Sequence, residues 1–369
     1  MLLGLIVLQL YLIGVDYFFR EKPEFSAQTP FYEIDNYYSN HLTHVWTKGD
    51  IYSFYGSKGG VNLEILDDNI FFIGGFEEKS IYDLKLISLD SSSGNILWQV
   101  PKNRPLLWLQ RQPTGLAANE NNVFLNWDST QKISGDTKIG AAKVIAYNSL
   151  GEQIWSQSIG GARSITTMIV NKNTVSVDGS FSSNYYLLDS NTGKEVNSIA
   201  KEIDNHIWFK DPQTLYRYSH IENSLEAVNQ TSGDILWRYS ISDPIYLAPK
   251  LANDTIVIRT NENRLVGRIL AGRILAINKT TGNLIWEASD ALSNVAITDS
   301  VVHYLTNDLL LRSININSGE IVGKTDFTPS KAVDPTHNVH QIATNGRMMF
   351  IYFGGEHQLS AFTFDNSQN

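Results

Sequence analysis

The chain alternates strand-length apolar runs with clusters of Asn, Asp and Gly, and it shows almost no helical periodicity from about Leu42 onward. One phrase recurs along it: a strand ends in Asn or Asp, a Gly closes a turn, and a new strand carries Trp about four residues after the Gly. Its six copies are 88–98, 146–155, 187–197, 227–237, 276–286 and 313–323. A phrase repeated in this way predicts a repeat protein.

A second phrase lies between these copies and predicts a β-hairpin, because two short apolar runs flank an Asn- or Asp-rich turn. It occurs seven times, at 61–75, 115–127, 165–179, 207–219, 246–260, 294–306 and 339–353. The copies recur about every 46 residues, a period typical of a four-stranded β-propeller blade.

The two phrases together predict an all-β, seven-bladed propeller with four antiparallel strands per blade. The hairpin supplies strands A and B, and the turn phrase supplies strands C and D; an eight-bladed ring fits the count less well. The last C strand, 357–364, has no D strand after it. We expect 42–46 to supply that strand and so close the ring, which removes exposed sheet edges.

The recurring residues are predicted to be structural. Gly in each turn suits a positive φ, the preceding Asn or Asp suits an Asx-turn, and each Trp is expected to lie across the adjoining blade. These residues are Gly94, Trp98, Gly151, Trp155, Gly193, Gly233, Trp237, Gly282, Trp286 and Gly319. Asn197 and Gly323 replace Trp in two blades, so those interfaces should be weaker.

The phrase A-x-[DN]-x-x-[TS]-G-x-x-x-W resembles the repeat of the pyrroloquinoline-quinone (PQQ)-like propeller family, over roughly 42–366. The resemblance implies two functions. One branch contains quinone- and calcium-dependent dehydrogenases; the other contains non-enzymatic scaffolds, such as the outer-membrane assembly lipoprotein. The alcohol-oxidising dehydrogenases carry a vicinal cysteine pair, and this chain has no Cys, either for such a pair or for a lipid anchor. No residue set matches the calcium site, so we expect a non-enzymatic protein without a cofactor.

The net charge of the chain limits the classes of partner that we expect. The formal net charge is −9, which argues against a nucleic-acid-binding surface. The two short His pairs, His41 with His44 and His337 with His340, have a spacing of three, which places side chains on opposite faces of a strand. We therefore expect no metal site at either pair.

The N-terminal residues 1–19 are apolar apart from Gln9 and Asp16 and are expected to be a membrane anchor or an uncleaved signal. A truncated membrane protein or a mis-assigned start is the alternative. Residues 20–41 are expected to be a linker, and 42–369 the propeller. These features predict membrane or cell-envelope association and leave the orientation open.

The lengths of the connections between strands single out one rim of the propeller as a candidate binding surface. The A–B and C–D turns are short throughout, whereas the B–C and D–A connections on the other rim are long and uneven at 50–60, 100–115, 126–142, 259–273 and 326–338. Trp, Tyr and Arg dominate interface hot spots, and this rim carries Tyr55, Arg104, Trp108, Arg111, Trp127, Arg264, Arg268, Arg273 and Lys331. The sequence thus predicts a scaffold that binds a protein or peptide through this rim; the alternative is a PQQ- and calcium-dependent dehydrogenase or a sugar-binding enzyme.

Overall fold

The computed structural model describes most of the chain from residue 32 onward. The described residues are 32–38, 42–49, 51, 63–75, 85–100, 113–127, 130–133, 136–139, 142–162, 164–179, 182–200, 205–210, 213–219, 222–229, 231–243, 245, 249–260, 272–329, 340–354 and 356–364. They form strands and turns without a helix, so no helix capable of crossing a membrane is found among them. The apolar segment 1–19 lies outside these residues.

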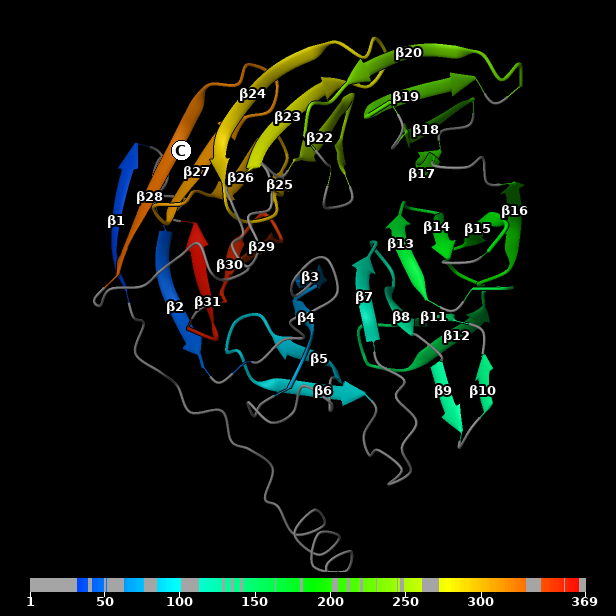
Figure 1. Ribbon diagram of the computed structural model, residues 1–369. Helices are drawn as coiled ribbons and strands as arrows, with labels where there is room; N and C mark the ends of the chain where they lie inside the picture. Colours follow the sequence, from blue (N-terminus) through cyan, green and yellow to red (C-terminus); the bar gives the residue numbers. More distant parts are fainter. Residues whose placement is uncertain are drawn as a thin grey trace, which may run out of the picture.

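Seven sheets of four or more strands are arranged in a ring, which confirms the seven-bladed propeller (Figure 1). Blade 1 is β3 (Leu63–Leu66), β4 (Asn69–Gly74), β5 (Lys85–Asp90) and β6 (Ile96–Val100). Blade 2 is β7 (Pro113–Ala118), β8 (Val123–Trp127), β11 (Lys143–Tyr147) and β12 (Gln153–Ser158). Blade 3 is β13 (Ile165–Val170), β14 (Thr174–Gly179), β15 (Asn184–Asp189) and β16 (Glu195–Ala200).

The remaining blades follow the same order from the inner strand A to the outer strand D. Blade 4 is β17 (Asn205–Lys210), β18 (Thr214–Ser219), β19 (Ser224–Asn229) and β20 (Ile235–Ser240). Blade 5 is β21 (Lys250–Ala252), β22 (Thr255–Arg259), β23 (Gly272–Asn278) and β24 (Leu284–Ala291). Blade 6 is β25 (Ala296–Thr298), β26 (Val301–Leu305), β27 (Leu310–Asn315) and β28 (Ile321–Pro329).

Blade 7 closes the ring as predicted. Its strands β29 (Gln341–Thr344), β30 (Met348–Phe353) and β31 (Gln358–Phe364) come from the C-terminal part of the chain, and its outer strand β2 (Leu42–Lys48) comes from the N-terminal part. The pair β2–β31 is antiparallel, with Leu42 opposite Phe364. The two ends of the propeller are therefore held in one sheet.

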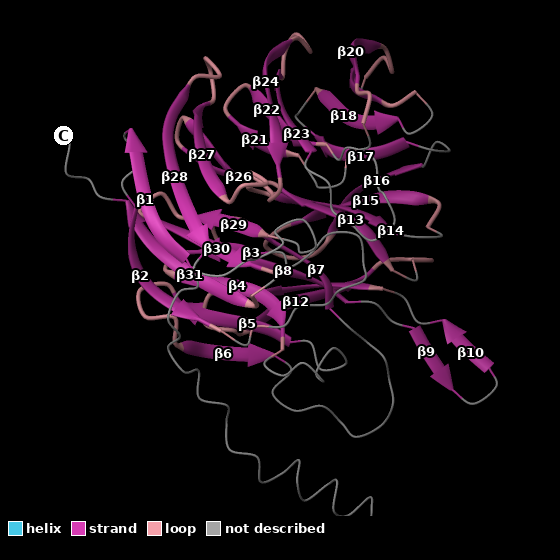
Figure 2. Ribbon diagram, turned by 60° about the vertical axis from the view of Figure 1, so that its left-hand side comes forward, coloured by secondary structure: helices cyan, strands magenta, loops and turns pink. Residues whose placement is uncertain are grey.

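Two elements go beyond the predicted pattern. Strand β1 (Tyr32–Tyr38), within the segment expected to be a linker, pairs with β28 as a fifth strand on the outside of blade 6 (Figure 1). The connection 126–142 contains a hairpin of β9 (Thr130–Ile133) and β10 (Asp136–Ile139), which stands out from the ring (Figure 2).

The turn glycines have the predicted conformation. All six have φ between 68° and 82°, and the carbonyl of the preceding Asn or Asp accepts a hydrogen bond from the Gly amide, as in Gly94 N to Asp90 O at 2.8 Å. The Asx side chain also accepts from the turn; Asn278 Oδ1 receives Thr280 N at 3.0 Å and Thr281 N at 2.9 Å. Hydrogen bonds from the turn hydroxyls lower the pKa of Asp90 and Asp189.

Each Trp of an outer strand D packs on the turn glycine of the next blade, where only a residue without a Cβ leaves room for the ring. A Cβ on Gly282 would lie 2.5 Å from the Trp237 ring. The Trp237 indole N–H also donates to Lys279 O, in the same turn, at 3.0 Å. The other Trp–Gly pairs are Trp46–Gly94, Trp98–Gly151, Trp155–Gly193 and Trp286–Gly319, each with an indole hydrogen bond to its turn.

Strand register makes room for these rings within each blade. Opposite the Trp, strand C carries a small residue, and strand B beyond it usually carries a large one, as in Phe124–Ala146–Trp155 and Tyr216–Ala227–Trp237. The indole therefore lies over the small residue and contacts the large ring, with centroids 5.7 Å apart in the first case. The residues paired across strands B, C and D thus leave space for the indole in each blade that carries a strand D Trp.

Blade 6 lacks Trp because blade 7 offers no turn to receive it. The C and D strands of blade 7 come from opposite parts of the chain, so no C–D turn with Gly joins them. Blade 6 instead has His303–Ser313–Gly323 across its strands. His303 is 3% exposed, its Nδ1 lies 2.8 Å from Ser313 Oγ, and its Nε2 lies 3.1 Å from Thr298 Oγ1.

The matched glycines Gly282 and Gly233 allow the Trp contact to be tested. Both have positive φ, at 72° and 78°, but a Cβ on Gly233 would meet nothing within 4 Å. Gly→Ala at either position should cost about 1 kcal/mol from backbone strain, whereas Gly282→Ala should cost about 1–3 kcal/mol more, from overpacking against Trp237. Urea unfolding measures the loss of stability in both variants. Equal losses would show that the Trp237 ring leaves room for a Cβ at position 282.

A second test concerns pH, because burial lowers the pKa of His303 to about 4. The unfolded chain has the ordinary pKa near 6.5, so the unfolded state binds the proton first as pH falls. Stability from this group should be complete above pH ~6.5 and fall by about 3 kcal/mol down to pH ~4. His303→Gln should flatten that part of the stability curve; an unchanged slope would assign the pH dependence to other groups.

Candidate functional site

Two of the nine predicted rim residues, Trp127 and Arg273, fall within the described part of the chain. Tyr55, Arg104, Trp108, Arg111, Arg264, Arg268 and Lys331 lie outside it, so their predicted role as binding residues stays a prediction. Both described residues are on the B–C and D–A rim, because Trp127 ends strand B of blade 2 and Arg273 begins strand C of blade 5.

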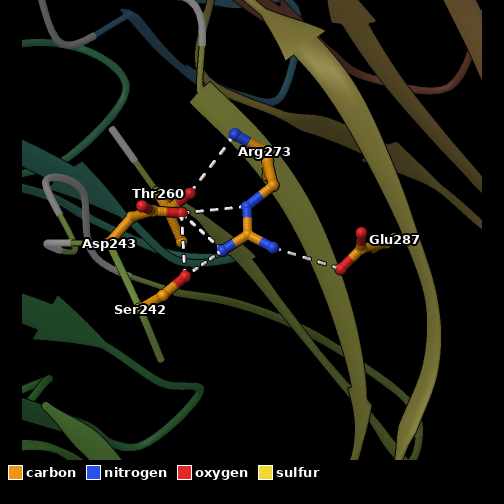
Figure 3. Close-up of polar contacts among 5 residues, drawn as sticks. All are labelled: Ser242, Asp243, Thr260, Arg273 and Glu287. Atoms are coloured by element: carbon orange, nitrogen blue, oxygen red, sulfur yellow. Dashed lines mark hydrogen bonds and ion pairs between the residues drawn. The ribbon is translucent and has the colours of Figure 1, made fainter. Parts of the chain in front are cut away.

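Arg273 is held in a polar cluster at this rim (Figure 3). Its Nε donates to Asp243 Oδ2 at 2.9 Å, and a second guanidinium nitrogen contacts the same oxygen. On the other side it meets Glu287 at 3.3 Å, and its backbone N–H donates to Thr260 Oγ1 at 3.2 Å. The hydrogen bond to Asp243 raises the pKa of Arg273. The side chain thus joins the connection after blade 4 to strand D of blade 5.

Trp127 also has a packing role. Its ring is half-buried and lies against the apolar cluster between blades 1 and 2, which includes Leu125 and Tyr147. Strand β8 holds it between Pro113 of β7 and Lys143 of β11. Trp127 therefore offers a partner only the part of its ring that is not packed.

Arg259 is a rim residue that the sequence patterns did not single out. It ends the buried strand β22, is 7% exposed, and donates from one terminal nitrogen to Ala291 O and Leu292 O, both at 3.2 Å. Burial lowers its pKa to about 10. Ala291 ends strand D of blade 5 and Leu292 begins the connection to blade 6. Arg259 therefore holds the connection after blade 5, as Arg273 holds the connection after blade 4, at the same rim. The one sequence signal for Arg259 is its position as a charged residue at the end of the apolar run TIVIR.

The inner strands carry an ion pair across the ring. Lys250 Nζ of blade 5 lies 3.7 Å from Glu64 Oε1 of blade 1, and these blades are not neighbours. Surrounding protein raises the pKa of Glu64, although a fifth of its side chain is exposed, and the Lys250 charge offsets part of the shift. The sequence could not reveal this pair, because each residue occupies an ordinary strand position.

The alternative function requires side chains that bind a quinone and a calcium ion. Among the described residues, no three His, Asp or Glu side chains converge as metal ligands would. Glu64, a carboxylate on the inner strand of blade 1, is paired with Lys250. His44 places Nε2 2.8 Å from Thr47 Oγ1, a contact to a hydroxyl and not to a second His. The described donors therefore do not fit a calcium–quinone site.

Comparisons with known proteins support the predicted resemblance. A family model described as "Outer membrane protein assembly factor BamB" matches residues 186–349, less than half of the chain. This match confirms PQQ-like repeats in that range. No curated protein matches the chain.

Solved structures resemble the chain at low identity. BamB from Moraxella catarrhalis is 13% identical, covers 95% of this chain and 99% of its own, and has a TM-score of 0.46. The computationally designed Ika8 protein is 13% identical over 85% of this chain and 99% of its own, with a TM-score of 0.48. KlHsv2, with loop 6CD replaced by a Gly-Ser linker, is 9% identical over 82% and 91%, with a TM-score of 0.50. At these identities the likeness concerns the fold alone.

The Arg273 cluster predicts a measurable coupling between Arg273 and Asp243. Both side chains are about a quarter exposed, so solvent screening limits their coupling to about 1 kcal/mol. A double-mutant cycle of Arg273→Ala and Asp243→Ala, followed by urea unfolding, measures it. Arg347→Ala, at an exposed turn on the other rim, should change stability by less than ~0.5 kcal/mol. Additive effects of the two cluster mutations would contradict the structural role of Arg273.

Proposed function

We propose, on the premise that the chain carries the PQQ-like repeats matched over residues 186–349, that it is a non-catalytic scaffold. It binds a protein or peptide partner through the B–C and D–A rim, in association with the cell envelope or a membrane. The family model is named for a protein of outer-membrane assembly, which supports a protein partner and an envelope setting.

The observation that carries the proposal is the contrast between the two rims. The C–D turns repeat one Asx–Gly geometry in six blades. The other rim varies from blade to blade and includes the projecting β9–β10 hairpin (Figure 2). Variable connections on a rigid ring are the usual place for recognition.

The described contacts support a stable platform at that rim. Hydrogen bonds of Arg259 and Arg273 attach blade 5 to the connections on either side of it, so the backbone there is held in place. A preorganised surface loses less conformational entropy on binding. In the sequence, the connection 261–271, with the predicted binding residues Arg264 and Arg268, lies between these two arginines.

Partner capture from detergent-solubilised membranes tests the proposal. The double variant Trp108→Ala/Arg111→Ala should reduce recovery of the captured protein at least tenfold, because hot-spot residues each contribute about 2 kcal/mol or more. The matched control, Leu150→Ala/Arg347→Ala, removes one apolar residue and one arginine from exposed turns of the other rim. It should leave recovery unchanged.

Equal recovery by the wild type and the Trp108/Arg111 variant, with both proteins folded, would contradict the rim assignment. An absorbance titration with the quinone and calcium tests the enzymatic alternative. Saturable quinone binding together with dye-linked substrate oxidation would contradict a non-catalytic scaffold.

A further inference from the structure

The seam between blades 3 and 4 departs from the rule that governs the other Trp interfaces. Across blade 3, the B–C–D pattern is Ser176–Leu187–Asn197, where blade 2 has Phe–Ala–Trp. Asn197 is exposed, whereas Trp155 at the equivalent place in blade 2 is 8% exposed. The indole and the large strand B residue are both missing from this seam.

The receiving side of the seam is nevertheless intact. Gly233, in the C–D turn of blade 4, has φ 78° and donates its N–H to Asn229 O at 2.9 Å, as its equivalents do. Asn229 Oδ1 accepts from Thr231 N at 2.8 Å and from Ser232 N at 3.1 Å. Yet Gly233 is exposed, and nothing would meet a Cβ there within 4 Å. Blade 4 therefore presents a glycine surface shaped like those that hold an indole.

A small cavity lies in the seam between blades 3 and 4. It is open to solvent and is lined by Tyr185, Leu187 and Ile199 of blade 3 and Leu215 of blade 4, with Ser176, Val177 and Tyr186. Leu187 lies directly opposite Asn197. Leu187 fills the place that Ala or Ser leaves free in other blades, so a guest ring would enter from the outer side, over Gly233.

The two blades without Trp differ at their outer edges. In blade 6, β1 pairs along β28, with Tyr38 opposite Gly323. In blade 3, the outer strand β16 pairs only with β15 among the described strands. Its free edge runs beside the cavity, so an extended polypeptide there could form backbone hydrogen bonds while it places a side chain in the seam.

We propose that this seam, defined by Gly233, Leu187, Ile199 and Leu215, binds a tryptophan side chain of a partner polypeptide. The Trp interfaces of the chain itself show how an indole binds such a surface. Five of its blades place an indole on a turn glycine of this geometry, and the indole N–H donates to a turn carbonyl. The site is separate from the B–C and D–A rim, because Gly233 belongs to a C–D turn.

The arginine side chains on the blade 4 side of the seam suit an aromatic guest. Arg217, Glu226 and Arg238 are aligned across blade 4 on the face opposite to Trp237. Glu226 is 2% exposed and accepts from Arg217 Nε at 2.8 Å and Arg238 Nε at 2.7 Å. Glu222 also pairs with Arg238, at 2.6 Å, so the two arginines and two glutamates balance in charge. Arginine planes stack favourably on indole faces.

Methyl NMR on the full chain tests the proposal with N-acetyl-tryptophanamide as the probe and N-acetyl-leucinamide as its control. The tryptophan probe should shift the methyl resonances of Leu187, Ile199 and Leu215 saturably, with half-saturation on the order of 1 mM for an isolated side chain. The leucine probe should shift them much less. No saturable shift, or equal shifts with both probes, would overturn the proposal.

A variant that supplies the missing indole provides the second test. Ser176→Phe/Leu187→Ala/Asn197→Trp copies the pattern of blade 2 into blade 3, and should raise the urea midpoint and abolish the probe-induced shifts at Ile199 and Leu215. Leu150→Trp adds an indole at a turn residue that is 74% exposed and should leave the shifts as in the wild type. Probe binding that persists in a folded triple variant would place the binding elsewhere and contradict the assignment.

Discussion

The contact between an indole and a turn glycine determines how this ring is assembled. Each Trp of strand D packs on a Gly of the next blade and donates to a carbonyl of the same turn, as Trp155 does with Gly193 and Ser190. The glycine has to accept a positive φ and also leave space for the ring. The contact therefore sets the spacing of neighbouring blades, and the apolar clusters between them follow from it.

The two exceptions show that the contact depends on topology. Blade 6 has Gly323 because blade 7 is made from two distant parts of the chain and has no C–D turn; β1 covers its outer edge instead. Blade 3 has Asn197 although blade 4 retains Gly233. Only in the second exception does the next blade keep a turn glycine that no indole covers. The seam between blades 3 and 4 differs in this respect from every other seam.

The repeat pattern predicted the blade count, the turn glycines and the closure by 42–46, because each depends on local sequence that recurs. Features made by single residues could not be predicted. Arg273 was expected to face a partner, but its guanidinium is paired with Asp243 and Glu287, which come from other parts of the chain. The pair of Lys250 and Glu64 forms only when the ring closes. The sequence predicts only a long loop over 126–142, because the strands of the hairpin β9–β10 are too short to show a pattern.

Hydrogen–deuterium exchange of the native protein tests most directly whether the indole–glycine contact governs the ring. The outer strands β16 and β24 occupy equivalent positions in blades 3 and 5, and only β24 carries a Trp, Trp286, packed on the next blade. If the contact governs blade docking, amides of 195–200 exchange at least tenfold faster than those of 284–291 in the absence of any partner. Equal protection of the two strands would contradict the account.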